Sequence, residues 1–142
     1  EYNIRMGDPE CQVLMMRLET DLLEIIDCAI KNKLSSLKIE WTKKNSITIV
    51  LCSKGYPSNY IKDSEIKNLS SVLTDENNQI FHAGTYEKNN KIYSNGGRVL
   101  GVTALGDTLQ DAITNAYSAT DKINCVSKYY RKDIGKKGLN AL

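Results

Sequence analysis

Ser46-Ile47-Thr48-Ile49-Val50-Leu51-Cys52 is the stretch of this 142-residue chain that decides its fold. The run is rich in β-branched residues and carries the strongest strand signal in the sequence. Gly55 and Pro57 follow closely and must end the strand, because both residue types interrupt regular backbone. We therefore expect a sheet that is built on residues 46–52.

Further strand signals lie on both sides of this stretch. In chain order, the other expected strands are residues 39–42, a short one around Ile66, then 79–85, 91–94 and 98–105. The polar loop 86–90 is expected to join two of them, 79–85 and 91–94, into a hairpin. The Asn95-Gly96-Gly97 turn precedes the last strand, which Gly101 interrupts.

One long helix follows the strands. Asp107, with Gln110 three residues later, resembles a capping box at the start of a helix. The apolar positions behind it recur at helical spacing, at Leu109, Ala112, Ile113, Ala116, Tyr117 and Ile123. Strands followed by one helix, without β–α alternation, predict a small antiparallel α+β domain.

Two shorter helices are expected before the strands. The first runs from Pro9 to about Leu18. The second starts at Thr20 or Asp21, where the Thr20 hydroxyl can cap free amides. Its apolar stripe consists of Leu22, Leu23, Ile26 and Ile30. The run Lys31-Asn32-Lys33 favours a helix end, so we place a domain boundary near residue 33.

Composition limits the classes of protein to which this chain can belong. Apolar residues make up 41% of the chain and charged residues 25%, which is ordinary for a globular domain. A net charge of +2 is too small to argue for nucleic acid or membrane as a partner, and no apolar run approaches a membrane span. Four cysteines without CxxC spacing, beside a single histidine, favour free thiols in a reducing cytoplasm over a zinc site.

The first ten residues combine metal-binding and helix-starting signals. Read as a strand, Glu1, Asn3 and Arg5 share one face, and carboxylate and amide oxygens suit Mg²⁺. Gly7 permits a turn, after which Asp8 can cap a helix that Pro9 begins. An edge strand with a solvated face, followed by a plain turn, explains the same residues equally well.

Three further positions could carry chemistry. Gly96-Gly97-Arg98 could hold an anion, and a hairpin turn with an exposed arginine is the alternative. Arg131 and Lys132 are adjacent cations that suit a phosphate, although basic runs are usually solvated surface. His82 lies in an expected strand, where a lone histidine more often has a structural role than a catalytic one.

Five motifs in matching order resemble one enzyme family across nearly the whole chain. They are residues 1–10 (EYNIRMGDPE), 54–57 (KGYP), 81–85 (FHAGT), 95–100 (NGGRVL) and 131–135 (RKDIG). They are similar to the carboxy-terminal third of the phosphoribosylamine–glycine ligases, a family of ATP-grasp enzymes. The resemblance implies a purine-biosynthesis ligase that joins glycine to 5-phosphoribosylamine with ATP, giving glycinamide ribonucleotide, ADP and phosphate.

The resemblance also implies an architecture and a set of roles. Residues 1–33 would end an ATP-grasp domain. Residues 34–142 would form a small β-rich domain similar to the carboxy-terminal domain of biotin carboxylase. The implied roles are metal ligands for Mg²⁺ or Mn²⁺ (Glu1, Asn3), a catalytic cation at the transferring phosphate (Arg5), the glycine and amine pockets (Asp8, Glu10), and binding of the phosphoribosylamine phosphate (Arg131, Lys132). Arg98, from the anion-holding turn, is a further candidate for substrate binding.

The resemblance implies that the isolated chain is inactive, because most of the ATP-grasp domain lies outside it. We expect the full enzyme to be a cytoplasmic monomer that binds ATP, glycine and 5-phosphoribosylamine. Two rival readings stay open at this point. One is another ATP-grasp carboxylate–amine ligase or carboxylase, and the other is a non-catalytic nucleotide- or phosphate-binding module.

Overall fold

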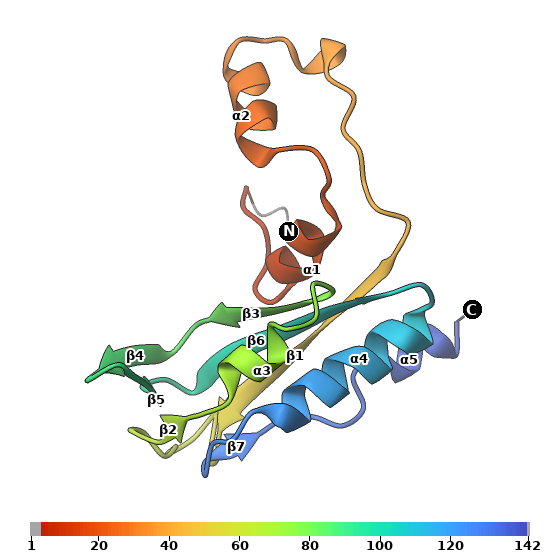
Figure 1. The fold of residues 1–142 in the computed structure, drawn as a ribbon. Coiled ribbons are helices and arrows are strands. Elements are labelled where there is room, and N and C mark those ends of the chain that lie inside the picture. Colours follow the sequence, from red (N-terminus) through yellow and green to blue (C-terminus); the bar gives the residue numbers. More distant parts are fainter. Residues whose placement is uncertain (1–3, 142) are drawn as a thin grey trace.

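The computed structural model describes residues 4–141 and contains two antiparallel sheets with helices packed around the larger one (Figure 1). In chain order the elements are α1 (Glu10–Arg17), α2 (Leu22–Ile30), the 3₁₀ helix η1 (Leu34–Ser36), β1 (Asn45–Ser53), β2 (Glu65–Ile66), α3 (Leu69–Val72), β3 (Asn78–His82), β4 (Thr85–Lys88), β5 (Lys91–Ser94), β6 (Arg98–Gly106), α4 (Leu109–Lys122), β7 (Lys128–Tyr129) and α5 (Lys136–Leu139). This arrangement confirms the expected α+β class.

The larger sheet is built on the strand that the sequence signals most strongly. Its strand order is β3-β6-β1-β7, and every neighbouring pair is antiparallel. Leu51 pairs with Leu100, but the next residue, Cys52, pairs with Arg98. Val99 is therefore the extra residue of a β-bulge, a feature that bends a strand and redirects its side chains.

The core lies between this sheet and α4. Alternate residues of β1, namely Ile47, Ile49 and Leu51, are buried, as period-2 geometry requires of a half-covered strand. The facing stripe of α4 is buried too, at Ala112, Ile113, Ala116, Ala119 and Thr120. Figure 1 shows α4 and α1 on opposite sides of the sheet, and α1 packs on β1 and β6.

The N-terminus of α4 differs from the expectation by one residue. Thr108, not Asp107, is the N-cap, and its hydroxyl accepts the Asp111 N–H at 3.1 Å. The Asp111 carboxylate in turn accepts the Thr108 N–H at 3.1 Å, which completes a capping box. A hydroxyl at the cap with a carboxylate three residues later satisfies two free amides, so this pair prevails over Asp107 with Gln110.

The expected hairpin is wrong in its pairing. β3 pairs with β6, and the hairpin instead joins β4 to β5 in a second sheet of order β2-β5-β4. Its two-residue turn is Asn89-Asn90, with φ of 53° and 58°. Asparagine tolerates the positive φ that tight hairpin turns need, so residues 85–88 pair locally as a strand and do not form a loop.

The N-terminal arm, which we define as residues 18–42, stands away from the sheets. Its two ends meet at an isolated bridge between Leu18 and Trp41, so residues 39–42 do not form the expected strand. Asp21 caps α2 by accepting the Leu23 N–H at 2.7 Å. The expected cap, Thr20, instead accepts the Glu40 N–H at 2.7 Å, because its hydroxyl faces the returning segment of the arm.

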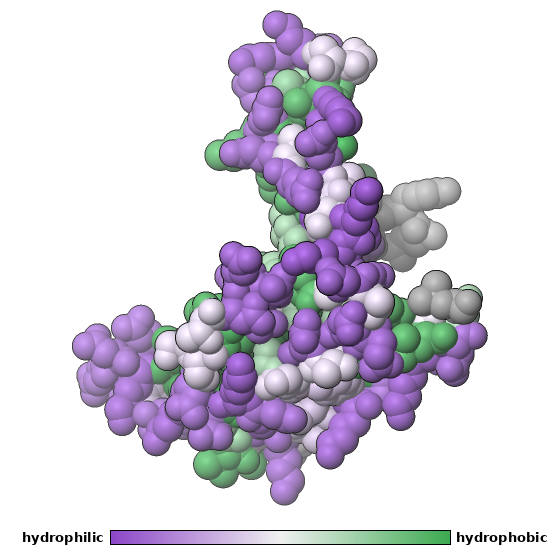
Figure 2. Space-filling view, turned by 45° about the vertical axis from the view of Figure 1, so that its right-hand side comes forward, coloured by the Kyte–Doolittle hydropathy of each residue, from purple (hydrophilic) through white to green (hydrophobic). Residues whose placement is uncertain are grey.

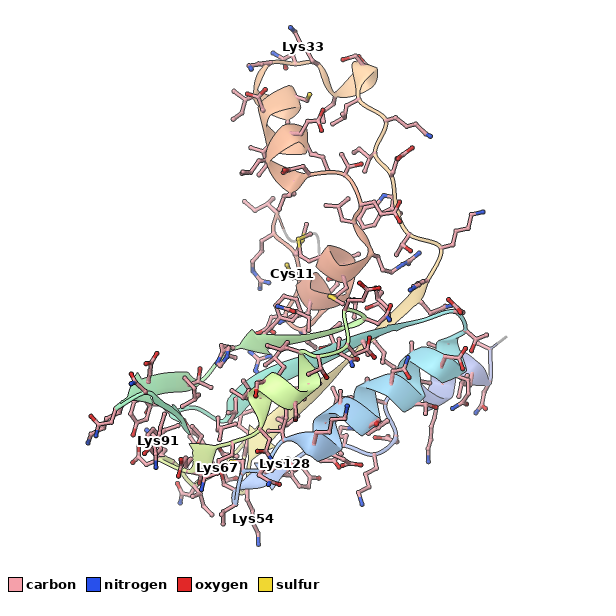
Figure 3. The ribbon with its side chains drawn as sticks, in the orientation of Figure 1. Cys11, Lys33, Lys54, Lys67, Lys91 and Lys128 are labelled. Carbon is pink, nitrogen blue, oxygen red and sulfur yellow. The ribbon has the colours of Figure 1, made fainter. Side chains whose placement is uncertain are left out.

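The arm buries none of the side chains of α2 or η1. Leu23 is 74% exposed and Ile30 is 76% exposed, although both belong to the expected apolar stripe. Figure 2 shows the arm as a narrow projection on a wider body, with apolar patches on its surface. In Figure 3, Cys11 lies beside the sheet while Lys33 lies at the far end of the arm. The expected boundary near residue 33 falls at that far end, between α2 and η1.

Within residues 4–141, no helix is both long enough and apolar enough to cross a lipid bilayer.

Candidate functional site

A pocket of about 310 Å³ lies where β1, the start of β6 and the segment after β7 meet the residue before α1. Its lining is mostly apolar, with two arginines among nine residues: Pro9, Thr48, Val50, Cys52, Arg98, Tyr129, Tyr130, Arg131 and Ile134. Four separate parts of the sequence therefore contribute to one site.

Strand β1 supplies the base of the pocket by simple alternation. Thr48, Val50 and Cys52 point away from the face that carries the buried core residues of β1. The Thr48 hydroxyl is buried and paired with the Thr103 hydroxyl at 2.6 Å, so the base has a satisfied polar group. Burial raises the pKa of the Cys52 thiol, and the nearby Arg98 charge opposes that rise in pKa only in part. Cys52 is thus a neutral wall residue at ordinary pH.

Close packing of two glycines, Gly84 and Gly96, fixes the backbone around Arg98. A Cβ on Gly84 would lie 2.6 Å from the Gly96 Cα, so these two turns contact each other through backbone alone. The Gly84 N–H donates to the Arg98 carbonyl at 2.9 Å, and the Asn95 N–H donates to the Gly84 carbonyl at 2.8 Å. The FHAGT and NGGRVL motifs therefore pack together, and Arg98 starts from a rigid position.

Arg98 reaches from β6 to the residues before α1. Its guanidinium forms an ion pair with the Asp8 carboxylate at 2.9 Å and donates to the Asp8 carbonyl at 3.3 Å. The two residues are 90 positions apart, so this contact fastens the N-terminal motif to the sheet. Both side chains remain partly solvated, which keeps the pair exchangeable.

The N-terminal motif differs from its expected local structure. Residues 4–6 form no strand and belong to neither sheet, and residues 1–3 fall outside the described part. Asp8 does not cap α1, which begins at Glu10. Instead the Glu10 carboxylate accepts the Gly7 N–H at 3.1 Å. The Asp8 carboxylate forms an ion pair with Arg98 and accepts a hydrogen bond from the Gln12 side chain.

Of the remaining N-terminal candidates, Arg5 is described by the structure and does not line the pocket. Arg5 is exposed and donates to the Met6 carbonyl at 3.0 Å. The expected metal ligands, Glu1 and Asn3, lie outside the described residues. Among residues 4–141, no group of three histidine, cysteine, aspartate or glutamate side chains is arranged to hold a metal ion.

Arg131 lines the pocket from the C-terminal motif. Its Nε and one terminal nitrogen donate to the two oxygens of Asp133 at 2.9 and 2.6 Å. This fork lowers the pKa of the Asp133 carboxyl and raises that of the Arg131 guanidinium, in both cases chiefly through the hydrogen bonds between them. Both groups are exposed to solvent, so the pair orients the arginine more than it stabilises the fold.

Lys132 does not accompany Arg131. It lines a neighbouring pocket of about 340 Å³ with Tyr117, Asp121 and Tyr130. There the Tyr130 hydroxyl donates to the Asp121 carboxylate, and this hydrogen bond is the main reason that the pKa of Tyr130 rises to about 12. The two adjacent cations of the motif therefore point to different hollows on either side of Tyr130.

The arrangement can bind an anion attached to a small organic group. Arg98 and Arg131 offer two guanidinium groups at one pocket, and guanidinium forks match phosphate oxygens. Each is held by an exposed carboxylate, a type of contact that contributes little to stability, so a phosphate can replace it. Tyr129, Val50 and Ile134 provide apolar walls for the rest of the ligand.

Sequence reasoning found the arginines but not the walls. Alternation within residues 46–52 is the local signal that could have placed Thr48, Val50 and Cys52 on one face. Nothing local indicated that Tyr129, Tyr130 and Ile134 would close that face, because the segment has no regular periodicity and its approach to β1 depends on tertiary pairing at Lys128 and Tyr129. His82 is exposed and its Nδ1 lies 2.9 Å from the Thr85 hydroxyl, a local structural contact.

Comparison with known proteins links this geometry to a family. Residues 46–137 match the family described as phosphoribosylglycinamide synthetase, C domain. The chain is 45% identical over 141 residues to a phosphoribosylamine–glycine ligase, chloroplastic, of Arabidopsis thaliana, covering 98% of this chain and 26% of that protein. It is 46% identical over 143 residues to a bifunctional purine biosynthetic protein of Dictyostelium discoideum, covering 100% of this chain and 18% of that one.

A solved structure agrees with the sequence relatives. The crystal structure of a phosphoribosylamine–glycine ligase from Thermotoga maritima superposes with a TM-score of 0.71 at 33% identity, over 94% of this chain and 32% of that one. The chain thus spans less than a third of these three relatives. The family match covers the sheet, α4 and the C-terminal motif, and this chain therefore belongs to the phosphoribosylglycinamide synthetase C-domain family.

Proposed function

We propose that this chain forms the C-terminal part of a phosphoribosylamine–glycine ligase, an enzyme of purine biosynthesis. The full protein would join glycine to 5-phosphoribosylamine, using ATP and releasing ADP and phosphate. Family membership and the names of the relatives support this reaction. The observation that carries the proposal for this chain is the meeting of Arg98 and Arg131, from motifs over thirty positions apart, at one pocket.

In this proposal the pocket binds the phosphate of 5-phosphoribosylamine. Arg98 and Arg131 exchange Asp8 and Asp133 for phosphate oxygens, and the ribose lies against Tyr129 and the apolar walls. A phosphate dianion accepts hydrogen bonds from both guanidinium groups at once, an arrangement stronger than either exposed carboxylate pair. Lys132, on the neighbouring hollow, contributes charge at longer range.

The ATP side of the site belongs to the N-terminal motif. Glu1 and Asn3 offer the carboxylate and amide oxygens that suit Mg²⁺ or Mn²⁺, and such an ion neutralises charge on ATP phosphates. Arg5 would stabilise negative charge at the transferring phosphate. Asp8 and Glu10 would border the glycine and amine positions, and displacement of Asp8 from Arg98 would link phosphate binding to that border.

The setting of the enzyme forms part of the same proposal. All four cysteines are free thiols in this chain, in keeping with a reducing compartment such as the cytoplasm. We propose a monomer that takes ATP, glycine and 5-phosphoribosylamine as its small-molecule partners.

The decisive test uses the full-length protein and separates the two adjacent cations. Arg131→Ala should raise the KM for phosphoribosylamine at least tenfold, because a charge-assisted phosphate contact is lost, and leave the KM for ATP nearly unchanged. Lys132→Ala serves as the matched control and should raise the KM for phosphoribosylamine by much less. An Arg131→Ala enzyme with an unaltered KM for phosphoribosylamine would overturn the proposed site.

A second test concerns this chain alone. Because the chain spans less than a third of the ligases that it matches, we expect the isolated 142 residues to release no ADP in the presence of ATP, glycine and phosphoribosylamine. Measurable substrate-dependent ADP release would contradict that expectation. The full-length protein assayed in parallel provides the positive control.

A further inference from the structure

The chain segment that carries Arg131 has little regular structure of its own. Between β7 and α5, residues 130–135 form no helix or strand. The Arg131 side chain can therefore occupy a fixed place at the pocket only if neighbouring elements hold the backbone around it. The element beside it is α4, which otherwise belongs to the core.

One hydroxyl on α4 holds both ends of the segment from Arg131 to Ile134. The Tyr117 hydroxyl donates to the Arg131 carbonyl at 2.9 Å and accepts the Ile134 N–H at 3.1 Å. Both of these backbone groups belong to pocket-lining residues. A single side chain thus ties together the two positions where the segment reaches the pocket.

Neighbouring contacts fix the approach to this clamp. The ring of Tyr117 packs against that of Tyr130, with centroids 6.1 Å apart, and the Tyr130 hydroxyl donates to Asp121 on the same helix. Lys128 donates to the carbonyls of Thr120 and Ile123, at 3.1 and 2.7 Å, at the C-terminal end of α4 (Figure 3). The segment from Lys128 to Ile134 therefore runs along α4, from the C-terminal end of the helix, which Lys128 contacts, to Tyr117, which holds Ile134.

We propose that Tyr117 is a positioning residue for substrate binding, which sets the Arg131 backbone so that its guanidinium meets the phosphate of phosphoribosylamine. This inference rests on the proposed function of the pocket. Tyr117 is not among the residues that line the pocket, and it lines the neighbouring hollow instead. Its effect on the reaction passes through Arg131, and it therefore acts on phosphoribosylamine binding and not on ATP.

The test is a cycle of three variants in the full-length protein: Tyr117→Phe, Arg131→Ala and the double variant. Tyr117→Phe keeps the ring and removes the hydroxyl. It should raise the KM for phosphoribosylamine about tenfold, the scale of one or two lost hydrogen bonds, with the KM for ATP and kcat nearly unchanged. In the Arg131→Ala background the same change should have almost no further effect, because the residue through which it acts is gone.

A matched control is available in the second sheet. The Tyr86 hydroxyl donates to Asp63 at 2.8 Å, so Tyr86→Phe also removes one hydroxyl hydrogen bond but lies away from the pocket. It should leave both KM values unchanged.

The possible outcomes separate the two claims. If Arg131→Ala raises the KM for phosphoribosylamine but Tyr117→Phe does not, the inference is wrong and the proposed function stands. If Arg131→Ala has no effect, the proposed site itself fails. A Tyr117→Phe enzyme with a lower melting temperature, a lower kcat and an equal rise in both KM values has lost structure only, which also overturns the inference.

Discussion

The N-terminal arm and the sheet domain, residues 45–139, make opposite use of similar apolar stripes. Both α2 and α4 carry apolar residues at helical spacing and an N-cap whose side chain accepts a backbone N–H. The stripe of α4 is buried on β1 and β6, whereas α2 buries none of its residues. A helical pattern therefore predicts the helix but not the partner that covers it.

The difference assigns separate physical roles to the two regions. The sheet domain has a closed core, in which Ile49, Val102 and Ala104 are fully buried. It can hold Arg98 and Arg131 in place without help from the arm. The arm contributes no core. Among the described residues before the arm, Asp8, Pro9 and α1 reach the sheet domain. Stability and pocket geometry should both depend on the sheet domain.

The largest contrast is expected for apolar truncations in the two regions. Ile49→Ala should lower the free energy of unfolding of this chain by about 2–5 kcal/mol, because it removes a fully buried side chain and leaves a cavity. Leu23→Ala, on the exposed stripe of α2, should change it by less than about 0.5 kcal/mol. Urea denaturation of the two variants measures both values. Equal losses would mean that the arm shares the core.

A smaller contrast is expected for the helix caps. Thr108→Ala breaks the capping box of α4 and should lower the free energy of unfolding by about 1 kcal/mol. Asp21→Ala removes a cap of similar kind from α2, but should leave global unfolding unchanged and only lower the protection of α2 amides in hydrogen exchange. A shared loss of global stability in both variants would contradict the separation of the two regions.

The smallest expected effect is a pH dependence at the edge of the sheet domain. The folded pKa of Tyr130, about 12, lies above its ordinary value because neutral Tyr130 donates to Asp121. The raised pKa means that this stabilisation is fully present below about pH 10 and is lost as the pH rises towards 12. Partial solvent exposure limits it to about 1 kcal/mol or less.

This pH dependence is measured as the difference in unfolding free energy between the unaltered chain and Tyr130→Phe. The difference should be present at pH 8 and shrink as the pH is raised above 10. A difference that grows with pH would show that the hydroxyl is not the donor. Phe at the same position keeps the ring contact with Tyr117 as an internal control.

Local sequence rules predicted what local interactions decide. Residues 46–52 and the stripe of α4 gave the correct elements, because alternation and helical spacing report directly on a buried face. The predicted hairpin was wrong in its pairing, because Asn89 and Asn90 form a tighter turn than the expected polar loop 86–90. The cap of α4 lay one residue later because Thr108 and Asp111 satisfy each other.

The site was predictable only in part, since it depends on long-range contacts. Arg98 and Arg131 were found by residue type and motif, and the structure brings both to one pocket. Their partners, Asp8 and Asp133, and the clamp at Tyr117 follow from where β7 and α4 lie in space. The separation of Lys132 from Arg131 likewise depends on Tyr130 standing between two hollows.

The most direct test of the central claim is a crystal structure of the full-length protein with glycinamide ribonucleotide bound. We expect the ribonucleotide phosphate to lie within about 3 Å of guanidinium nitrogens of Arg98 and Arg131, with the ribose against Tyr129. A phosphate bound elsewhere, with both arginines still paired to Asp8 and Asp133, would contradict it.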